Sequence, residues 1–163
     1  MSMTSLVDVL RNNNLFAALS PDELERICKL IFLRSYAEGR TLFFEGTPGE
    51  VMYLIHSGRV AIVKTGRDKR EMVLATLEPG SFFGEMSILD AQPRSASARV
   101  VADAELVVIT KKAFDQMLET DPGITSKILI ALLKTVFARL RSTDEKFKAL
   151  NIVDGSQGSA RQE

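Results

Sequence analysis

Residues 51–63 read Val-Met-Tyr-Leu-Ile-His-Ser-Gly-Arg-Val-Ala-Ile-Val, two apolar runs on either side of Gly58. The same pattern continues through residues 32–110, where seven of the ten glycines separate short apolar stretches. Such runs, bounded by glycine, are typical of antiparallel β-strands. About seven or eight strands are predicted, folded as a β-roll or jelly-roll sandwich. The other runs lie at 41–44, 72–75 and 106–109.

Helices are predicted on both sides of these strands. Ser20-Pro21-Asp22-Glu23 combines a hydroxyl cap, a proline at the first helical position and a glutamate at the third. This capping box predicts a helix over about 21–31, after a shorter one over about 6–14. Past the strands, Thr110 and Asp121-Pro122 are caps for two helices that together cover about 111–150. The fold class is therefore mainly β, with an N-terminal helix and a long C-terminal helix.

The last predicted helix carries a heptad pattern in which nearly every position is apolar. Packing against the chain's own β-region is one explanation, and a two-chain coiled coil is the other. Because the pattern continues past Thr143, where a small domain has little surface left to cover, we expect a homodimer through this helix. Residues 1–150 then form one domain, and 151–163 are predicted to be a disordered Gly/Ser-rich tail or linker. The pattern consists of Leu129, Leu133, Val136, Leu140, Thr143, Phe147 and Leu150.

Charge and hydropathy narrow the class of protein. The 163 residues are 45% hydrophobic and carry 21 Lys+Arg against 21 Asp+Glu, so their formal net charge is zero. No global basic field is available to attract nucleic acid or an acidic membrane. The start of the chain has no basic segment followed by an apolar run, and no apolar stretch is long enough to span a bilayer. We expect a cytoplasmic protein with no membrane partner.

Catalysis and metal binding are disfavoured by the scarcity of suitable side chains. Cys28 and His56 are the single cysteine and the single histidine of the chain. Together they cannot supply the usual zinc ligands, and a metal-dependent cupin would need several histidines. No Ser-His-Asp or Cys-His pairing can be assigned, so we expect no catalytic residue, no metal site and no enzymatic activity.

One segment does carry the chemistry of a binding site. Residues 82–97 read Phe-Phe-Gly-Glu-Met-Ser-Ile-Leu-Asp-Ala-Gln-Pro-Arg-Ser-Ala-Ser. Gly84 permits close approach to the backbone, and a helical turn beginning at Glu85 would present free N–H groups at its start. Arg94 is suited to binding phosphate oxygens in a bidentate way, and the Glu85 carboxylate can accept a hydrogen bond from a hydroxyl group. The segment indicates a site for a phosphorylated sugar; the alternative is a Glu85–Arg94 surface salt bridge.

These residues resemble the cyclic nucleotide-binding domain of catabolite-activator-type regulators, cyclic-nucleotide-dependent kinases and cyclic-nucleotide-gated channels. The phosphate-binding cassette of that family has the pattern F-G-E-[LM]-[AS]-[LI], a short variable stretch, then P-R-[STA]-A-[ST]. Residues 83–88 and 93–97 match it throughout. The resemblance covers roughly residues 10–145. It also includes Leu15-Phe16, Leu19-Ser20, Tyr36, Gly39, Gly46, Gly49, Tyr53-Leu54-Ile55 and Gly58.

The resemblance implies roles for individual residues. Arg94 is expected to bind the cyclic phosphate with backbone amides near Ser87 and Ser95, and Glu85 to accept the ribose 2′-hydroxyl. The ligand expected is cAMP, with cGMP as the second candidate, and no other cofactor is implied. The full set of expected ligand-binding residues is Phe83, Gly84, Glu85, Met86, Ser87, Arg94 and Ser95, with Val73 and Ala75 against the purine. Candidates for covering the base from the long helix are Thr135, Arg139 and Lys134.

The implied function is that of a sensor domain whose C-terminal helices move when the ligand binds and so regulate an effector. The catabolite-activator type continues beyond its long helix into a winged helix-turn-helix, whereas residues 151–163 are Gly/Ser-rich. We therefore expect no direct DNA binding by this chain, and the effector is unknown. Two alternatives are a jelly-roll dimerisation module with a degenerate pocket and, less favoured, a cupin-like enzyme.

Overall fold

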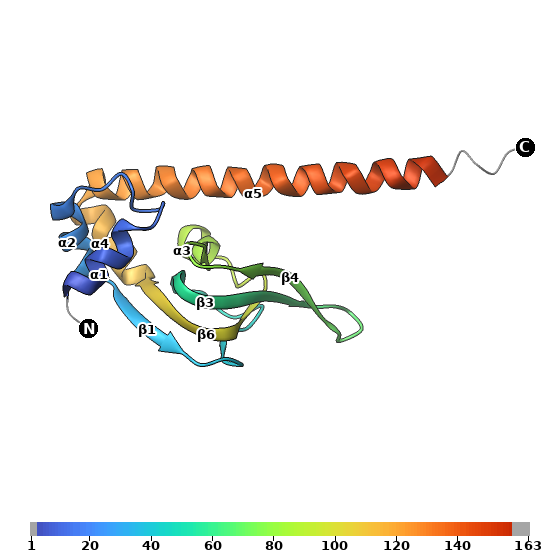
Figure 1. Cartoon of the computed structure of the whole chain (residues 1–163), viewed down its shortest axis with the longest axis horizontal. Coiled ribbons are helices and arrows are strands. Elements are labelled where there is room, and N and C mark those ends of the chain that lie inside the picture. Colours follow the sequence, from blue (N-terminus) through green and yellow to red (C-terminus); the bar gives the residue numbers. More distant parts are fainter. Residues whose placement is uncertain (1–2, 158–163) are drawn as a thin grey trace, which may run out of the picture.

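The computed structural model describes residues 3–157, and within them the surroundings of side chains 6–148. An antiparallel sheet lies beside a group of helices at one end, and α5 runs along the top and extends beyond the sheet (Figure 1). The predicted fold class is confirmed. The helices are α1 (Met3–Arg11), α2 (Pro21–Cys28), α3 (Glu85–Asp90), α4 (Lys111–Thr120) and α5 (Pro122–Gln157). The strands are β1 (Phe32–Tyr36), β2 (Thr41–Phe43), β3 (Val51–Thr65), β4 (Glu71–Leu77), β5 (Phe82–Phe83) and β6 (Ser97–Thr110).

The sheet is built on two long strands, β3 and β6, which pair antiparallel from Val51↔Thr110 to Val63↔Ser97. Their register shifts at three places between Ile55 and Val60. Such bulges bend and twist a strand pair. On one side of the bend the pair adds β1 and β5, and on the other side it adds β2 and β4. The result is a bent, unclosed β-roll.

The prediction of seven or eight strands was wrong, because the described residues form a six-stranded sheet. The apolar runs at 51–55 and 60–63, which were expected to be separate strands, belong to β3. Gly58, with φ +81°, does not reverse the chain but lies inside the bulged stretch, where an added Cβ would overlap the backbone of Asp103 and Ala104. Glycine here permits a bulge and a close strand contact rather than a turn.

The two faces of β3 pack into two different cores. Met52 and Leu54 face a core shared with the helices, whereas Tyr53 and Ile55 face the interior of the roll. β6 divides in the same way, with Val107 in the first core and Leu106 in the second. Because side chains alternate along a strand, both strands are apolar at nearly every position here. The helices and the roll are therefore mechanically joined through β3 and β6.

Helices α2 and α4 begin at the positions that their capping residues predicted. Ser20 and Glu23 form the expected capping box of α2, and the Thr110 side chain accepts the Ala113 N–H at the start of α4. The predicted ends were less accurate, because α2 stops at Cys28 and the first helix spans Met3–Arg11. Within the described residues, no helix has the length and apolar character needed to cross a membrane.

Helix α5 is attached to the domain by its first part. Ile124, Ile128 and Leu132 are buried in the helical core, and the Lys127 ammonium lies 2.8 Å from the Glu23 carboxylate of α2. The helix continues to Gln157, beyond the end predicted near Leu150, so residues 151–157 are helical rather than disordered. That prediction relied on the Gly/Ser-rich composition of the tail, yet the helical part contains one of its glycines, Gly155, which costs a helix only about 1 kcal/mol. Residues 158–163 of the predicted tail lie outside the described residues.

Candidate functional site

A cavity of about 220 Å³ opens between the roll, α3 and α5. Eight of the nine ligand-binding residues predicted from the sequence border it: Phe83, Gly84, Glu85, Met86, Ser87, Arg94, Ser95 and Ala75. The remaining wall comes from residues that the prediction did not include, namely Phe43, Ile62, Leu77 and Ala96, and from Arg139, which was a candidate for covering the base. The structure thus gathers one continuous motif and four distant elements around a single hollow.

The local fold of the cassette follows from residues 82–85. Phe82 and Phe83 form β5 against β3, and they point into the helical core and the roll interior respectively. Gly84 follows with φ +80°, a conformation that L side chains rarely adopt, and α3 starts directly at Glu85. Two buried aromatic rings therefore fix the strand, and the glycine turns the chain so that Glu85 faces the cavity.

Arg94 is buried, with only 6% of its surface exposed. Its Nη1 donates to the Gly84 carbonyl at 3.0 Å and its Nη2 to the Val51 carbonyl at 2.6 Å. Its Nε has no hydrogen-bond partner among the described residues. Burial lowers the pKa of Arg94, although an arginine remains charged at neutral pH. A desolvated cation with an unused donor is an unusual arrangement, because buried polar groups are normally satisfied.

Two glycines make room for this guanidinium. A Cβ added at Gly84 would lie 2.7 Å from Arg94 Nη1 and 2.9 Å from the Val51 carbonyl oxygen. A Cβ at Gly49 would lie 2.7 Å from Arg94 Nε and would overlap the Ser87 side chain. Neither position has space for a side chain. Gly49 matched the family's series of glycines in the sequence, but only the structure gives it this role.

An aromatic ring supports the other side of Arg94. The guanidinium carbon lies 4.0 Å from the centre of the Phe43 ring, within the range of a cation–π contact. Phe43 in turn stacks on Tyr53 with ring centres 6.3 Å apart and contacts Phe83 at 6.0 Å. Phe43 lies on β2, far from the cassette in sequence, and no local pattern pointed to it. Arg94 is thus held between main-chain carbonyls and a ring, and no carboxylate of the described residues is bound to it.

Glu85 takes a different partner from the one considered in the sequence. Its Oε1 lies 3.4 Å from Nη1 of Arg139 on α5, and the residue is only 8% exposed. The alternative of a Glu85–Arg94 surface salt bridge is wrong, because both residues are buried and the carboxylate pairs with Arg139. Of the other base-covering candidates, Lys134 is exposed and the Thr135 hydroxyl donates to the Ala131 carbonyl within α5.

The two residues expected against the purine are separated by a bulge. Ala75 opposes Ile62 and borders the cavity, whereas Val73 opposes Val63 and is 61% exposed. The register shift leaves Leu74 as the extra residue of β4, which breaks the simple alternation. Val73 is therefore not brought to the cavity. Leu77 and Ile62 provide the apolar surface there instead.

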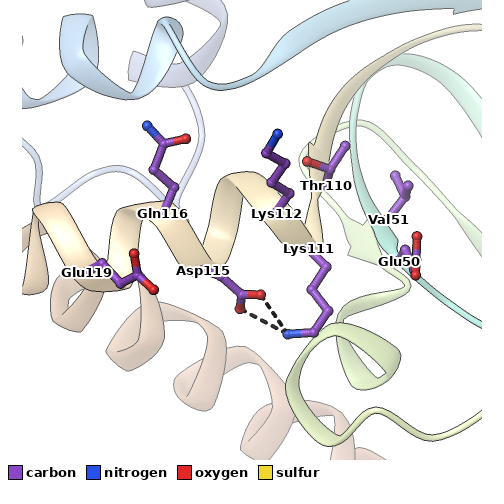
Figure 2. A pocket seen from close by; sticks show the side chains of 8 residues that line it. All are labelled: Glu50, Val51, Thr110, Lys111, Lys112, Asp115, Gln116 and Glu119. Carbon is purple, nitrogen blue, oxygen red and sulfur yellow. Dashed lines mark hydrogen bonds and ion pairs between the residues drawn. The ribbon is translucent and has the colours of Figure 1, made fainter.

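A second, larger hollow of about 580 Å³ lies where α4 meets the start of β3. Figure 2 shows its charged lining, with the Lys111 ammonium paired to both oxygens of Asp115 at 2.9 Å. Glu50, Lys112 and Glu119 add further charges of both signs. No unsatisfied buried side-chain atom of the described part of the chain belongs to this hollow. Among the described residues, no cluster of three metal-ligating side chains occurs either. The cavity at Arg94 is the better candidate.

Comparison with models of protein families shows to which family this chain belongs. The model of the family described as cyclic nucleotide-binding domain matches residues 33–121, more than half of the chain. This chain belongs to that family. The resemblance inferred from the cassette is confirmed, and the matched range contains Glu85, Arg94 and all of the β-roll except Phe32, the first residue of β1.

Individual relatives cover most of the domain. The cyclic AMP receptor protein of Thermus thermophilus is 32% identical over 87% of this chain and 64% of its own length. A cAMP-dependent protein kinase regulatory subunit of Colletotrichum orbiculare is 31% identical over 78% of this chain and 32% of its own. A cyclic nucleotide-binding domain crystal structure from Methylobacillus flagellatus superposes with a TM-score of 0.78 at 28% identity, over 88% and 81% of the chains. This chain therefore spans less than two thirds of the two curated relatives.

Proposed function

We propose that this cyclic nucleotide-binding domain is a receptor for cAMP that passes ligand occupancy to an effector through α5. The observation that carries the proposal is Arg94, a buried cation whose Nε is unused and whose neighbours are carbonyl dipoles and a ring. A bound phosphate would give that charge a counter-ion and its free donor an acceptor. Among the described residues that line the cavity, Arg94 alone combines burial with an unused hydrogen-bond donor.

The rest of the cavity suits the other parts of a cyclic nucleotide. The Glu85 carboxylate can accept a hydrogen bond from a sugar hydroxyl, and Gly84 allows the sugar to approach the main chain. The apolar side chains of Ile62, Ala75 and Leu77 offer a surface for a purine. We assign phosphate to Arg94, ribose to Glu85 and base to the β3–β4 side of the cavity.

The preference for cAMP over cGMP is supported by the names of the relatives. The Thermus receptor and the Colletotrichum kinase subunit are both named for cyclic AMP. cGMP is the second candidate, and a thermal-shift comparison of both nucleotides ranks them directly.

A role as a regulator rather than an enzyme is part of the proposal. The relatives named above are a receptor protein and a kinase regulatory subunit. We place the protein in the cytoplasm, where Cys28, a free cysteine in the structure, would stay reduced. The effector is a separate domain or protein of unknown identity, and direct DNA binding by residues 1–163 is not part of the proposal.

We also propose that a second copy of the chain covers the outer face of α5. Ile130, Leu133, Phe137, Leu140 and Phe147 are all exposed and follow one another at spacings of three, four, three and seven. This stripe shares Leu133, Leu140 and Phe147 with the predicted pattern. Of the other predicted positions, Leu129 packs against the helical core, Val136 is 38% exposed against 51% for its neighbour Phe137, Thr143 is polar, and the Leu150 side chain lies outside the described ones. An apolar stripe of this period on a helix that extends past its own domain favours helix–helix pairing.

Calorimetric titration of cAMP into the Arg94→Ala variant tests the ligand assignment. We expect affinity to fall by at least about 100-fold, because the phosphate would lose a desolvated, charged donor. Arg94→Lys should recover only part of the loss, since an ammonium cannot reproduce the guanidinium geometry. Arg34→Ala is the matched control, because Arg34 also stacks on a phenylalanine ring, Phe32, but lies outside the cavity. Unchanged affinity in Arg94→Ala would remove Arg94 from the site.

Sedimentation velocity of the Leu140→Asp variant tests the second copy. A carboxylate in the centre of the stripe should raise the dimer dissociation constant by at least about 100-fold, because two copies of the charge would be buried. Leu118→Asp is the control, since Leu118 is an exposed leucine on α4. A wild-type chain that stays monomeric at tens of micromolar, or a Leu140→Asp chain that still forms dimers, contradicts the proposed pairing.

A further inference from the structure

The main chain of Arg94 is held by the loop between β2 and β3. The Gly46 N–H donates to the Arg94 carbonyl at 2.8 Å, and the Arg94 N–H donates to the Thr47 carbonyl at 2.9 Å. Because the guanidinium also makes two hydrogen bonds, Arg94 is fixed at both its main chain and its side-chain end. Ser95, the next residue, borders the cavity as well, but it takes part in none of these four hydrogen bonds. The position of Ser95 therefore depends on other contacts.

Lys64, near the end of β3, makes such a contact. Its Nζ donates to the Ser95 carbonyl oxygen at 3.3 Å. Lys64 follows Ile62, a residue that borders the cavity, by two positions, so the two side chains lie on the same face of β3. At the other end of β3, the Val51 carbonyl accepts a hydrogen bond from Arg94 Nη2 at 2.6 Å. One strand thus contacts the guanidinium at its start and the next residue of the cassette near its end.

The Lys64 ammonium is oriented by Glu45, in the loop after β2. Nζ lies 3.4 Å from Glu45 Oε1, while Glu45 Oε2 accepts the Thr65 N–H at 3.4 Å. The Glu45 N–H in turn donates to the Ser97 hydroxyl at 2.9 Å. The Lys64 side chain is 51% exposed, and a lysine has many rotamers to lose when it is ordered. The carboxylate and the Ser95 carbonyl are the two acceptors that direct its charge towards the cassette.

We propose that Lys64 is a positioning residue of the phosphate site, which acts by holding the Ser95 main chain at the edge of the cavity. This inference rests on the proposed function, because it needs a phosphate at Arg94. The Ser95 amide can donate to a phosphate oxygen only in one orientation of the main chain, and the hydrogen bond from Lys64 restrains the carbonyl of the same residue. Lys64 itself is not among the residues that line the cavity, so its effect passes through Ser95.

The test measures, by calorimetry, how cAMP and its Rp and Sp phosphorothioate analogues bind to wild type, Lys64→Met and Lys64→Arg. Lys64→Met should bind cAMP about three- to tenfold more weakly, because methionine fills a similar space but cannot donate to the Ser95 carbonyl. The loss should differ between Rp and Sp, since sulfur replaces a different exocyclic oxygen in each and only one oxygen can face the Ser95 amide. Lys64→Arg should restore most of the affinity and the wild-type ratio of Rp to Sp.

Two further variants are controls for the charge and for the hairpin. Lys69→Met removes an exposed ammonium from the same hairpin and leaves Lys64 in place, so its binding should match wild type. Glu45→Gln removes the partner charge but leaves the Lys64 ammonium free to donate to Ser95, so the ratio of Rp to Sp should stay as in wild type. The urea midpoints of Lys64→Met and Lys69→Met should equal that of wild type, because both lysines are exposed.

The outcomes separate the positioning role from the proposed function. If wild type binds cAMP and Lys64→Met binds it equally well, the positioning role is overturned and the receptor function stands. A loss that is equal for Rp and Sp, or that Lys64→Arg does not recover, also overturns it, because a general disturbance of the hairpin would act on both analogues alike. If wild type binds none of the three nucleotides, the receptor function fails and the positioning role fails with it.

Discussion

Two arginines border the cavity from opposite regions: Arg94 lies with Phe43 and Gly84 on what we call the floor, and Arg139 lies on the α5 side. Both present a guanidinium to the cavity, yet they are held differently. Arg94 is buried against two carbonyl oxygens and the Phe43 ring, with no ion pair in the described residues. Arg139 is half-exposed and forms an ion pair with Glu85. The floor therefore keeps a positive charge available to an incoming anion, whereas the α5 side has its charge already neutralised.

Because of this difference, the floor and the α5 side contribute to ligand binding in different ways. A cation surrounded only by dipoles loses solvation without gaining a counter-ion, so a bound phosphate improves its surroundings directly. A cation paired with a carboxylate already has a counter-ion, so it gains less from an incoming anion. The floor supplies binding energy, and the α5 side supplies a contact that binding can change. Mutations confined to one region should therefore affect the domain in different ways.

The largest effect is expected from crowding the floor with Gly84→Ala. The new Cβ would meet the Arg94 guanidinium and the Val51 carbonyl, and the residue would be held at φ +80°. We expect the free energy of unfolding to fall by about 3 kcal/mol, measured by urea denaturation. Gly39→Ala is the matched control, because Gly39 has φ +84° but open space around its Cβ position. It should cost only about 1 kcal/mol, from backbone strain alone.

Equal losses in the two glycine variants would contradict the role of Gly84 as space for Arg94. The cost would then come from backbone conformation, which both positions share. A larger loss at Gly84 combined with weakened cAMP binding would tie the stability of the floor to the position of the guanidinium. The Gly39 variant should keep wild-type affinity, since Gly39 lies outside the cavity.

Much of the fold could be predicted because its signals are local. The capping box at Ser20–Glu23 and the Thr110 cap placed helix starts correctly, since a cap is defined within four residues. The number of strands could not be predicted as well. Whether Gly58 ends a strand or sits in a bulge depends on the facing residues Asp103 and Ala104, which are distant in sequence. Whether a glycine ends a strand or lies in a bulge is decided by strand pairing between residues that are distant in sequence.

The candidate site, like the fold, could be predicted where its residues are close together in sequence and not where they are distant. The residues of the cassette, including Glu85 and Arg94, were identified because they are close together in sequence and their chemistry is recognisable. Phe43 was missed because its position under Arg94 arises from the pairing of β2 with β6. Val73 lies outside the cavity whereas Leu77 borders it, since the bulge at Leu74 shifts which β4 side chains face inward. Arg139 was among the candidates, but its contact with Glu85 was not foreseen.

A smaller and more selective effect is expected from Phe43→Leu, which removes the ring beneath Arg94 and leaves its hydrogen bonds in place. A desolvated cation–π contact is worth about 1–2 kcal/mol, so affinity for cAMP should fall about tenfold in calorimetry. Phe44→Leu is the control from the neighbouring position, because Phe44 is 61% exposed. Hydrogen exchange in α5 should be unchanged in Phe43→Leu, since the change is confined to the floor. A loss of binding in Phe44→Leu as large as that in Phe43→Leu would mean that the effect does not come from the ring beneath Arg94. Faster exchange in α5 of Phe43→Leu would mean that the two sides of the cavity are not separable, because a perturbation beneath Arg94 would then also reach the Glu85–Arg139 contact.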